Sequence, residues 1–125
     1  MIEIVSTANA PAALGPYSQA IKTNGFIYCS GQIPINPASN AVEAVSIEDQ
    51  TRQAITNLKN VLEAAGSSLA NVVKTTVFIK DMNDFVALNG VYAEMFGDTK
   101  PARSCVEVAR LPKDVKVEIE AIAVC

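Results

Sequence analysis

The sequence predicts one α+β domain, residues 1–125, in which two helices cover one face of a single sheet. Three observations predict this fold class. Only two stretches carry apolar residues at helical spacing, the other apolar runs are short, and no repeat or linker divides the 125 residues. Half of the residues are hydrophobic and 18% are charged, which is typical of a chain that buries a core. The predicted element order is β-β-β-α-β-α-β-β.

The first part of the chain is predicted to form strands and loops. Residues 2–5 suit a short edge strand, and residues 9–16, which contain two prolines, suit a loop. Asn24-Gly25 lies between predicted strands at 18–22 and 26–33. This dipeptide favours a two-residue type I′ hairpin, because both turn residues need a positive φ.

A surface loop at 34–45 is expected to lead into the first helix. Ser46 begins a capping-box-like pattern, Ser-Ile-Glu-Asp, and Gly66 is the expected stop. The apolar residues of this helix recur at helical spacing: Ala54, Ile55, Leu58, Val61, Leu62 and Ala65. The β-branched run at 71–80 is predicted to be a strand with apolar groups on both faces, Val72, Thr76 and Phe78 on one and Val73, Val77 and Ile79 on the other.

The second helix is predicted over residues 83–96, with Gly97 as its stop. Gly90 inside it costs about 1 kcal/mol relative to alanine. Close packing, room for a ligand beside Asn89, or simple tolerance would each explain this glycine. The apolar face of the helix contains Phe85, Leu88, Tyr92, Met95 and Phe96.

Two strands, in the runs that begin at Arg103 and Val117, complete the sheet. Because two helices cover only one face, the second face of the sheet is left uncovered. Ile122 lies on the same side of the last strand as Glu118 and Glu120, so this surface is part apolar and part charged. A homo-oligomer would bury such a surface.

The composition excludes several classes of function. A net charge of −3 and scattered basic residues argue against binding to nucleic acid. The absence of histidine excludes Ser-His-Asp and Cys-His catalysis and removes the commonest zinc ligand. Three cysteines without a Cys-x-x-Cys pair suit a reducing compartment, and no stretch resembles a signal peptide or a membrane span. We therefore expect a cytoplasmic protein with no nucleic-acid or membrane partner.

Charged side chains interrupt the last two strands, and we expect the chemistry there. Strand alternation places Arg103, Cys105 and Glu107 on one face of their strand, and Glu118 and Glu120 on one face of the next. We expect these groups to gather on one side of the sheet. The planar guanidinium of Arg103 suits a carboxylate ligand, but an ion pair with one of the three glutamates is the alternative.

The sequence pattern does not choose among the three glutamates. Glu118 and Glu120 project about 7 Å apart, so only one of them can address a ligand held by Arg103 and act as a general base. A nearby cation would lower the pKa of Cys105, yet no histidine could activate this thiol, so we expect it to line a pocket.

Two further segments are weaker candidates for ligand binding. Tyr17 and the pair Ser30-Gly31 lie in loop or strand-end segments that could present a phenol, a hydroxyl and a backbone amide to a ligand. The sequence shows no phosphate loop, dinucleotide fingerprint or metal-ligand cluster. Any catalysis is therefore expected to need no cofactor and no metal.

Five blocks of this sequence together resemble one known family. They are Gly15-Pro-Tyr-Ser-Gln-Ala, Ser30-Gly-Gln-Ile-Pro, the 53–66 helix ending in Leu-Glu-Ala-Ala-Gly, Val73-Lys-Thr-Thr-Val-Phe, and Pro101-Ala-Arg-Ser-Cys-Val-Glu-Val-Ala-Arg-Leu-Pro with Val117-Glu-Ile-Glu. These blocks, of which the last is highly specific, resemble the RidA/YjgF family of enamine/imine deaminases. The resemblance covers nearly the whole chain.

The resemblance implies a chorismate-mutase-like α+β fold, assembled as a homotrimer with active sites in the clefts between subunits. It implies a 2-iminobutanoate/2-iminopropanoate deaminase, which hydrolyses 2-aminoacrylate, 2-aminocrotonate and their imines to 2-oxo acids and ammonia without a cofactor. A module that binds 2-oxo acids or related carboxylates without turnover is the alternative.

The resemblance also implies roles for individual residues. Arg103 would hold the substrate carboxylate, and Glu118 would position the attacking water. Cys105, Ser30 and Gly31 would line the pocket, with Tyr17 and Asn89 at its walls or mouth. By this resemblance, the segment before Arg103, residues 97–101, is shorter than in many relatives. A different cleft wall at this segment would leave the breadth of substrates open but not the reaction type.

Overall fold

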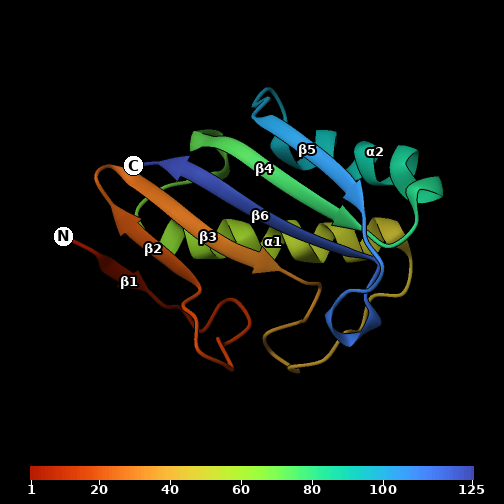
Figure 1. Cartoon of the computed structure of the whole chain (residues 1–125), viewed down its shortest axis with the longest axis horizontal. Coiled ribbons are helices and arrows are strands. Elements are labelled where there is room, and N and C mark those ends of the chain that lie inside the picture. Colours follow the sequence, from red (N-terminus) through yellow and green to blue (C-terminus); the bar gives the residue numbers. More distant parts are fainter.

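The computed structural model describes all 125 residues and confirms the predicted element order (Figure 1). Both helices lie on one face of the sheet, as predicted. The helices are α1 (Ile47–Ala64) and α2 (Phe85–Phe96). The strands are β1 (Glu3–Val5), β2 (Ala20–Thr23), β3 (Phe26–Gln32), β4 (Val72–Ile79), β5 (Ala102–Glu107) and β6 (Val117–Val124), and short 3-10 turns cover Leu69–Asn71, Met82–Asp84 and Pro112–Asp114.

The six strands form one sheet in the order β1-β2-β3-β6-β4-β5. β4 and β5 pair in parallel and are joined by α2, whereas every other neighbouring pair is antiparallel. The last strand, β6, returns to the middle of the sheet between β3 and β4 (Figure 1). The two strands with charged residues therefore differ in position, since β6 is central and β5 is an edge strand.

Local sequence signals produce the expected turns and helix ends. Asn24 and Gly25 both have a positive φ, 51° and 79°, which confirms the type I′ hairpin between β2 and β3. The Ser46 hydroxyl accepts a hydrogen bond from the Asp49 backbone N–H at the start of α1. Gly66, with φ 86°, follows the end of that helix.

The prediction for β4 is wrong at its first two residues. Val72 is buried, whereas Val73 is 43% exposed, although Val73 was expected to share a face with Val77. A register shift between Val72 and Lys74 in the pairing with β6 explains the difference, because a β-bulge inserts one residue and reverses the alternation. From Thr75 onward the strand alternates regularly.

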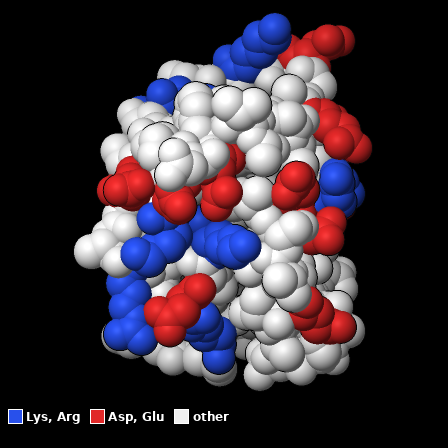
Figure 2. All heavy atoms as spheres, turned by 90° about the vertical axis from the view of Figure 1, so that its right-hand side faces the viewer, with Lys and Arg blue, Asp and Glu red and all other residues white.

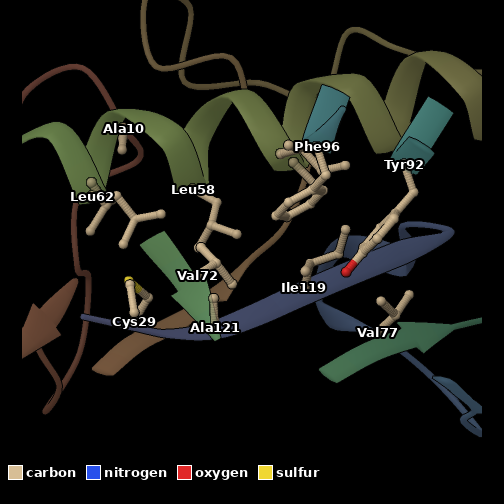
Figure 3. Close-up of a cluster of buried hydrophobic side chains, with 14 of the residues drawn as sticks. Ala10, Cys29, Leu58, Leu62, Val72, Val77, Tyr92, Phe96, Ile119 and Ala121 are labelled. Carbon is tan, nitrogen blue, oxygen red and sulfur yellow. The ribbon is translucent and has the colours of Figure 1, made fainter. Parts of the chain in front are cut away.

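The core lies between the sheet and the helices (Figure 3). Tyr92 and Phe96 project from α2 toward the sheet and stack with ring centroids 4.4 Å apart. The Tyr92 hydroxyl forms a buried 2.8 Å hydrogen bond with the Thr75 hydroxyl on β4. This bond and the stacked rings hold α2 over β4. Fully buried side chains from α1 and the sheet complete the core, among them Ile27, Ile55, Leu58, Leu62, Val77, Ile79, Val117 and Ile119.

One buried polar side chain fastens the loop after β3 to α1. The Asn57 amide nitrogen donates hydrogen bonds to the carbonyls of Ile33, at 3.1 Å, and Ile35, at 2.9 Å. The Asn57 side-chain oxygen accepts a hydrogen bond from Gln53, so the amide is satisfied on both sides. Burial of this amide is favourable only because each of these partners is present.

We expect the substitution Asn57→Ala to lower the free energy of unfolding by about 2 to 3 kcal/mol, because it leaves the two carbonyls without a partner. Urea unfolding at a fixed protein concentration measures the loss. Asn60→Ala is the matched control, since Asn60 donates one exposed hydrogen bond to the Asn9 carbonyl and its loss should cost less than about 1 kcal/mol. Equal losses for the two variants would contradict the role assigned to Asn57.

Candidate active site

Arg103 lies near the start of the edge strand β5 and points to the helix side of the sheet. Its Nη1 donates a 2.7 Å hydrogen bond to the Asn89 side-chain oxygen on α2. Its guanidinium carbon lies 4.8 Å from the ring centre of Tyr92 and 5.5 Å from that of Phe85. Phe85, Asn89 and Tyr92 are four and three residues apart, so they share one face of α2. The helix thus holds the guanidinium with one amide oxygen and two aromatic faces.

Arg103 has no carboxylate partner, although the other two arginines do. Arg52 pairs with Glu94 at 3.4 Å, and Arg110 pairs with Asp114 at 2.6 Å. The alternative prediction, an ion pair between Arg103 and a neighbouring glutamate, is therefore wrong. Because its anchors are neutral, Arg103 keeps its whole positive charge for an anionic ligand.

The Arg103 side chain lies in the wall of a hollow with a volume of about 330 Å³. The wall contains two basic residues and no acidic one: Asn89, Tyr92, Ala93, Phe96, Gly97, Thr99, Lys100, Pro101 and Arg103. Its charge and its aromatic sides suit a small organic anion.

Cys105 lies two residues beyond Arg103 on the same face of β5 and is half-buried. Burial raises the pKa of the Cys105 thiol, and the charge of Arg103 offsets only part of that rise. Arg103 thus lowers this pKa, as expected of a nearby cation, but desolvation outweighs it and the net change is a rise. A largely protonated thiol is a poor nucleophile. Cys105 packs against the hydrophobic core and is not among the residues that line the hollow beside Arg103, so its expected pocket-lining role stays a prediction.

Glu118 lies on the other face of the sheet. Val117 and Ile119, its neighbours on β6, are buried beneath the helices, so Glu118 points to the uncovered side. Gly31 on the adjacent strand β3 makes room for the carboxyl group, since a Cβ at Gly31 would lie 2.5 Å from the Glu118 Oε2 atom. The absence of a side chain at Gly31 thus allows the Glu118 carboxyl to pack directly against the backbone.

The structure distinguishes the three glutamates that the sequence left open. Burial, and next the negative charge of Glu120, raise the pKa of Glu118 above its ordinary value of 4.5. Glu120 is exposed, and a Glu107 carboxylate oxygen accepts a hydrogen bond from the Met82 backbone N–H at 2.8 Å. Glu118 combines partial burial with a raised pKa, the properties of a general base.

Tyr17 and Gly31 share the wall of a second hollow, with a volume of about 210 Å³. Tyr17 is 56% exposed at its rim. The loop before it is fastened by Gln19, a buried residue whose side chain accepts from the Thr7 N–H at 2.7 Å and donates to the Pro11 carbonyl at 2.8 Å. Sequence reasoning missed Gln19, because nothing in its spacing indicates that it is buried.

The hydroxyl of Ser30 has a structural partner. Its Oγ donates a 2.6 Å hydrogen bond to the Ser18 carbonyl, and its backbone N–H donates to the Gln19 carbonyl. These bonds fasten β3 to the segment before β2 and so fix the backbone that presents Gly31. Ser30 therefore lies beside the second hollow, where its hydrogen bonds stabilise the backbone next to Gly31.

The expectation that Arg103, Cys105, Glu107, Glu118 and Glu120 gather on one side of the sheet is wrong. β4 lies between β5 and β6, and its residues Thr75 and Phe78 are the partners of Arg103 and Glu118 respectively. The Cα atoms of Arg103 and Glu118 are two strands apart across the sheet and three residues apart along it. This corresponds to a distance of roughly 14 Å. The side chains also point to opposite faces, so no small ligand can touch both within one chain.

The candidate residues instead form two separate groups in each chain. We call Asn89, Arg103 and Cys105 the arginine half-site, and Tyr17, Gly31 and Glu118 the carboxylate half-site. Sequence reasoning placed Phe85 and Tyr92 in the core only, whereas their rings also face Arg103. Their spacing with Asn89 along one helix face was the signal that could have indicated this.

Two findings concern other kinds of ligand. No group of three or more acidic or cysteine side chains is arranged to hold a metal ion, and no helix has the length and apolar character needed to cross a bilayer. On the end of the molecule that Figure 2 shows, basic and acidic side chains lie side by side. This face therefore does not present a continuous basic surface of the kind that binds phosphate backbones.

Comparisons with known proteins agree with the fold and the motifs. The sequence profile of the Endoribonuclease L-PSP family matches residues 7–125. A RutC family protein from Pyrococcus horikoshii is 58% identical over 123 residues, which is 98% of each chain. The 2-iminobutanoate/2-iminopropanoate deaminase of Escherichia coli K12 is 54% identical over 127 residues, covering 99% of this chain and 98% of that protein.

Solved structures give the same result. The crystal structure of a putative endoribonuclease L-PSP from Entamoeba histolytica superposes with a TM-score of 0.98 at 50% identity, over 100% of both chains. Sequence motifs, fold and overall similarity thus agree, and the chain belongs to the Endoribonuclease L-PSP family, the same family that its motifs predicted under the name RidA/YjgF.

Proposed function

We propose that this protein hydrolyses reactive 2-imino acids and their enamine tautomers, such as 2-iminobutanoate and 2-iminopropanoate, to 2-oxo acids and ammonia. The observation that carries the proposal is the environment of Arg103, a guanidinium held by neutral groups in a hollow and free of any acidic partner. The name of the 54% identical Escherichia coli relative supports the same activity. Such an arginine selects a substrate with a carboxylate.

In this proposal Arg103 binds the substrate carboxylate, and its bond to Asn89 keeps the guanidinium plane in place. Ionised Glu118 accepts a proton from a water molecule, and the water oxygen forms a bond to the imine carbon. Glu118 returns this proton to the imine nitrogen, which gives a carbinolamine. It then accepts the hydroxyl proton and passes it to the nitrogen, so the carbon–nitrogen bond breaks, the carbon–oxygen double bond of the 2-oxo acid forms, and ammonia leaves. The products equal the imino acid plus one water, so the reaction requires no oxidant or cofactor. The raised pKa of Glu118 makes it a stronger base than an ordinary glutamate.

We further propose that a second copy of the chain completes each site. Arg103 and Glu118 lie on opposite faces of the sheet, so the arginine half-site of one subunit must meet the carboxylate half-site of another. Repetition of one head-to-tail contact closes a ring, and a homotrimer is the assembly that the family resemblance implies. The uncovered sheet face supports association, because one row of apolar side chains crosses four strands on it: Ile4, Ile21, Tyr28 and Ile122.

Two other functions receive less support. A module that binds 2-oxo acids without turnover would need Arg103 but not the raised pKa of Glu118. RNA cleavage, which the family name describes, is disfavoured in this chain by a net charge of −3 and the absence of histidine.

The direct test generates 2-iminobutanoate in the assay with a threonine dehydratase and follows the release of 2-oxobutyrate. The wild-type protein should accelerate release, and Arg103→Ala should lower kcat/KM by about 100-fold or more, because it removes charge-assisted bonds of about 1.5 to 3 kcal/mol each. Arg103→Lys keeps the charge but loses the planar guanidinium, so its kcat/KM should lie between those of wild type and Arg103→Ala. Arg52→Ala is the control and should change kcat/KM less than twofold, since Arg52 forms an exposed ion pair.

No acceleration over buffer by the wild-type protein would refute the proposed activity. In that case, calorimetric binding of 2-oxobutyrate by wild type, lost in Arg103→Ala, would favour the binding module.

The site between subunits predicts complementation between two inactive variants. Arg103→Ala and Glu118→Gln subunits should each be inactive alone, but mixed oligomers formed by co-expression at equal levels should recover roughly a quarter of wild-type activity. A complete site forms only where a subunit with Arg103 meets one with Glu118 in the required order, which is one of four random pairings. Mixing of preformed oligomers, without subunit exchange, is the control. Zero recovery in confirmed mixed oligomers would show that both groups act from one chain.

The pKa of Glu118 predicts the effect of its neighbour on pH dependence. Activity requires the ionised form, so kcat/KM should fall on the acid side as Glu118 becomes protonated. Glu120→Gln removes a negative charge that raises the pKa of Glu118, so the acid limb of the pH profile should move to lower pH. Glu107→Gln removes an equal charge from the opposite face of the sheet and should leave the limb in place. A shift to higher pH in Glu120→Gln would exclude Glu118 as the base.

A further inference from the structure

The hollow beside Arg103 is larger than a four-carbon imino acid requires. Its volume of about 330 Å³ lies at the lower end of the roughly 300 to 1,000 Å³ that is typical of sites for much larger organic ligands. A substrate carboxylate bound to Arg103 would therefore leave space in the same hollow. The groups that line this space indicate which substrate side chain would fit it.

Lys100 is a second basic residue in the wall of this hollow. Lys100 forms no ion pair or side-chain hydrogen bond in the structure, and none of the nine lining residues is acidic. Lys100 and Arg103 are three positions apart in the sequence, which limits the distance between their Cα atoms to about 10 Å. Two long basic side chains at that separation can address the two ends of one small dicarboxylate.

The backbone around Lys100 is held in a defined conformation. The Gly97 N–H donates to the Ala93 carbonyl and the Thr99 N–H donates to the Phe96 carbonyl, so the segment turns back over the end of α2. Gly97 has φ 60° and ψ −125°, a conformation that a residue with a side chain rarely adopts. Pro101 restricts Lys100 to extended backbone conformations. Lys100 thus faces the hollow from a segment that is anchored on both sides.

Neither Arg103 nor Lys100 has a negatively charged partner, so the hollow should prefer ligands that carry two negative charges. A monocarboxylate would neutralise Arg103 alone, whereas a dicarboxylate would neutralise both Arg103 and Lys100. The apolar part of the wall, from Tyr92, Ala93 and Phe96, would contact the methylene groups between the two carboxylates. The Thr99 hydroxyl offers one further hydrogen bond donor.

From these observations we infer that Lys100 is a specificity-determining residue that binds the distal carboxylate of 2-imino dicarboxylates, the imines of acidic amino acids. The inference rests on the proposed deaminase function, because it assigns the first carboxylate to Arg103. The reaction itself is unchanged. Water adds to the carbon–nitrogen double bond and ammonia leaves, so a 2-oxo dicarboxylate is the product.

The first experiment measures binding, with stable 2-oxo acids as probes. Calorimetry on the wild-type oligomer should show tighter binding of 2-oxoglutarate than of 2-oxobutyrate, with the difference decreasing as salt is added. Lys100→Ala should weaken binding of 2-oxoglutarate about tenfold and that of 2-oxobutyrate less than twofold. Lys59→Ala, which removes an equal charge from an exposed pair with Glu63 on α1, is the control and should change neither.

The second experiment measures turnover of imines generated in the assay by amino-acid oxidases, from glutamate and from 2-aminobutyrate. Lys100→Ala should reduce the ratio of kcat/KM for the dicarboxylate over the monocarboxylate about tenfold, and Lys100→Arg should restore most of that ratio. If wild type hydrolyses the monocarboxylate imine but Lys100→Ala leaves the ratio unchanged, the inference is wrong and the proposed function stands. If wild type hydrolyses neither imine, the proposed function itself is wrong.

Discussion

The rest of the structure depends on the burial of one face of β6 beneath α1. Val117, Ile119, Ala121 and Ala123 lie on that face, and none of them is more than 3% exposed. A strand that buries alternate residues must present the others on the opposite side, so Glu118 and Glu120 face away from the helices. Because β6 lies between β3 and β4, the Glu118 carboxyl also meets Gly31 on the neighbouring strand.

The same constraint separates the two charges that we assign to the chemistry. β5 pairs with β4 in a register that places Arg103 on the helix side, where α2 supplies an amide oxygen and two ring faces. Glu118 is half-buried on the other side, with no cation to stabilise its charge. A single chain therefore carries an unpaired cation and a carboxyl with a raised pKa on two different surfaces. In the proposed function, contact between copies brings the two groups to one substrate, and hydrolysis then requires no histidine.

Much of this fold was predictable because its signals are local. The Asn24-Gly25 turn, the Ser46 cap and the glycine after α1 each depend on the conformations of a few adjacent residues, and the structure confirms all three. The side on which Val73 lies was not predictable, because a bulge depends on how β4 registers with β6 about fifty residues later. The effect of Arg103 on the pKa of Cys105 was predictable from their spacing, but the larger effect of desolvation was not, because it depends on what packs around the thiol.

The sequence by itself determined the element order, the family and the residues that carry charge into otherwise apolar strands. It did so because hydrophobic period, turn residues and motif spacing are properties of short segments. Only the tertiary structure decided which side chains meet, and it placed Arg103 and Glu118 on opposite faces where strand alternation had suggested one shared surface. Which residues of a strand face the helices depends on its register with the neighbouring strands and on where the helices pack. Both are fixed only when the whole sheet assembles.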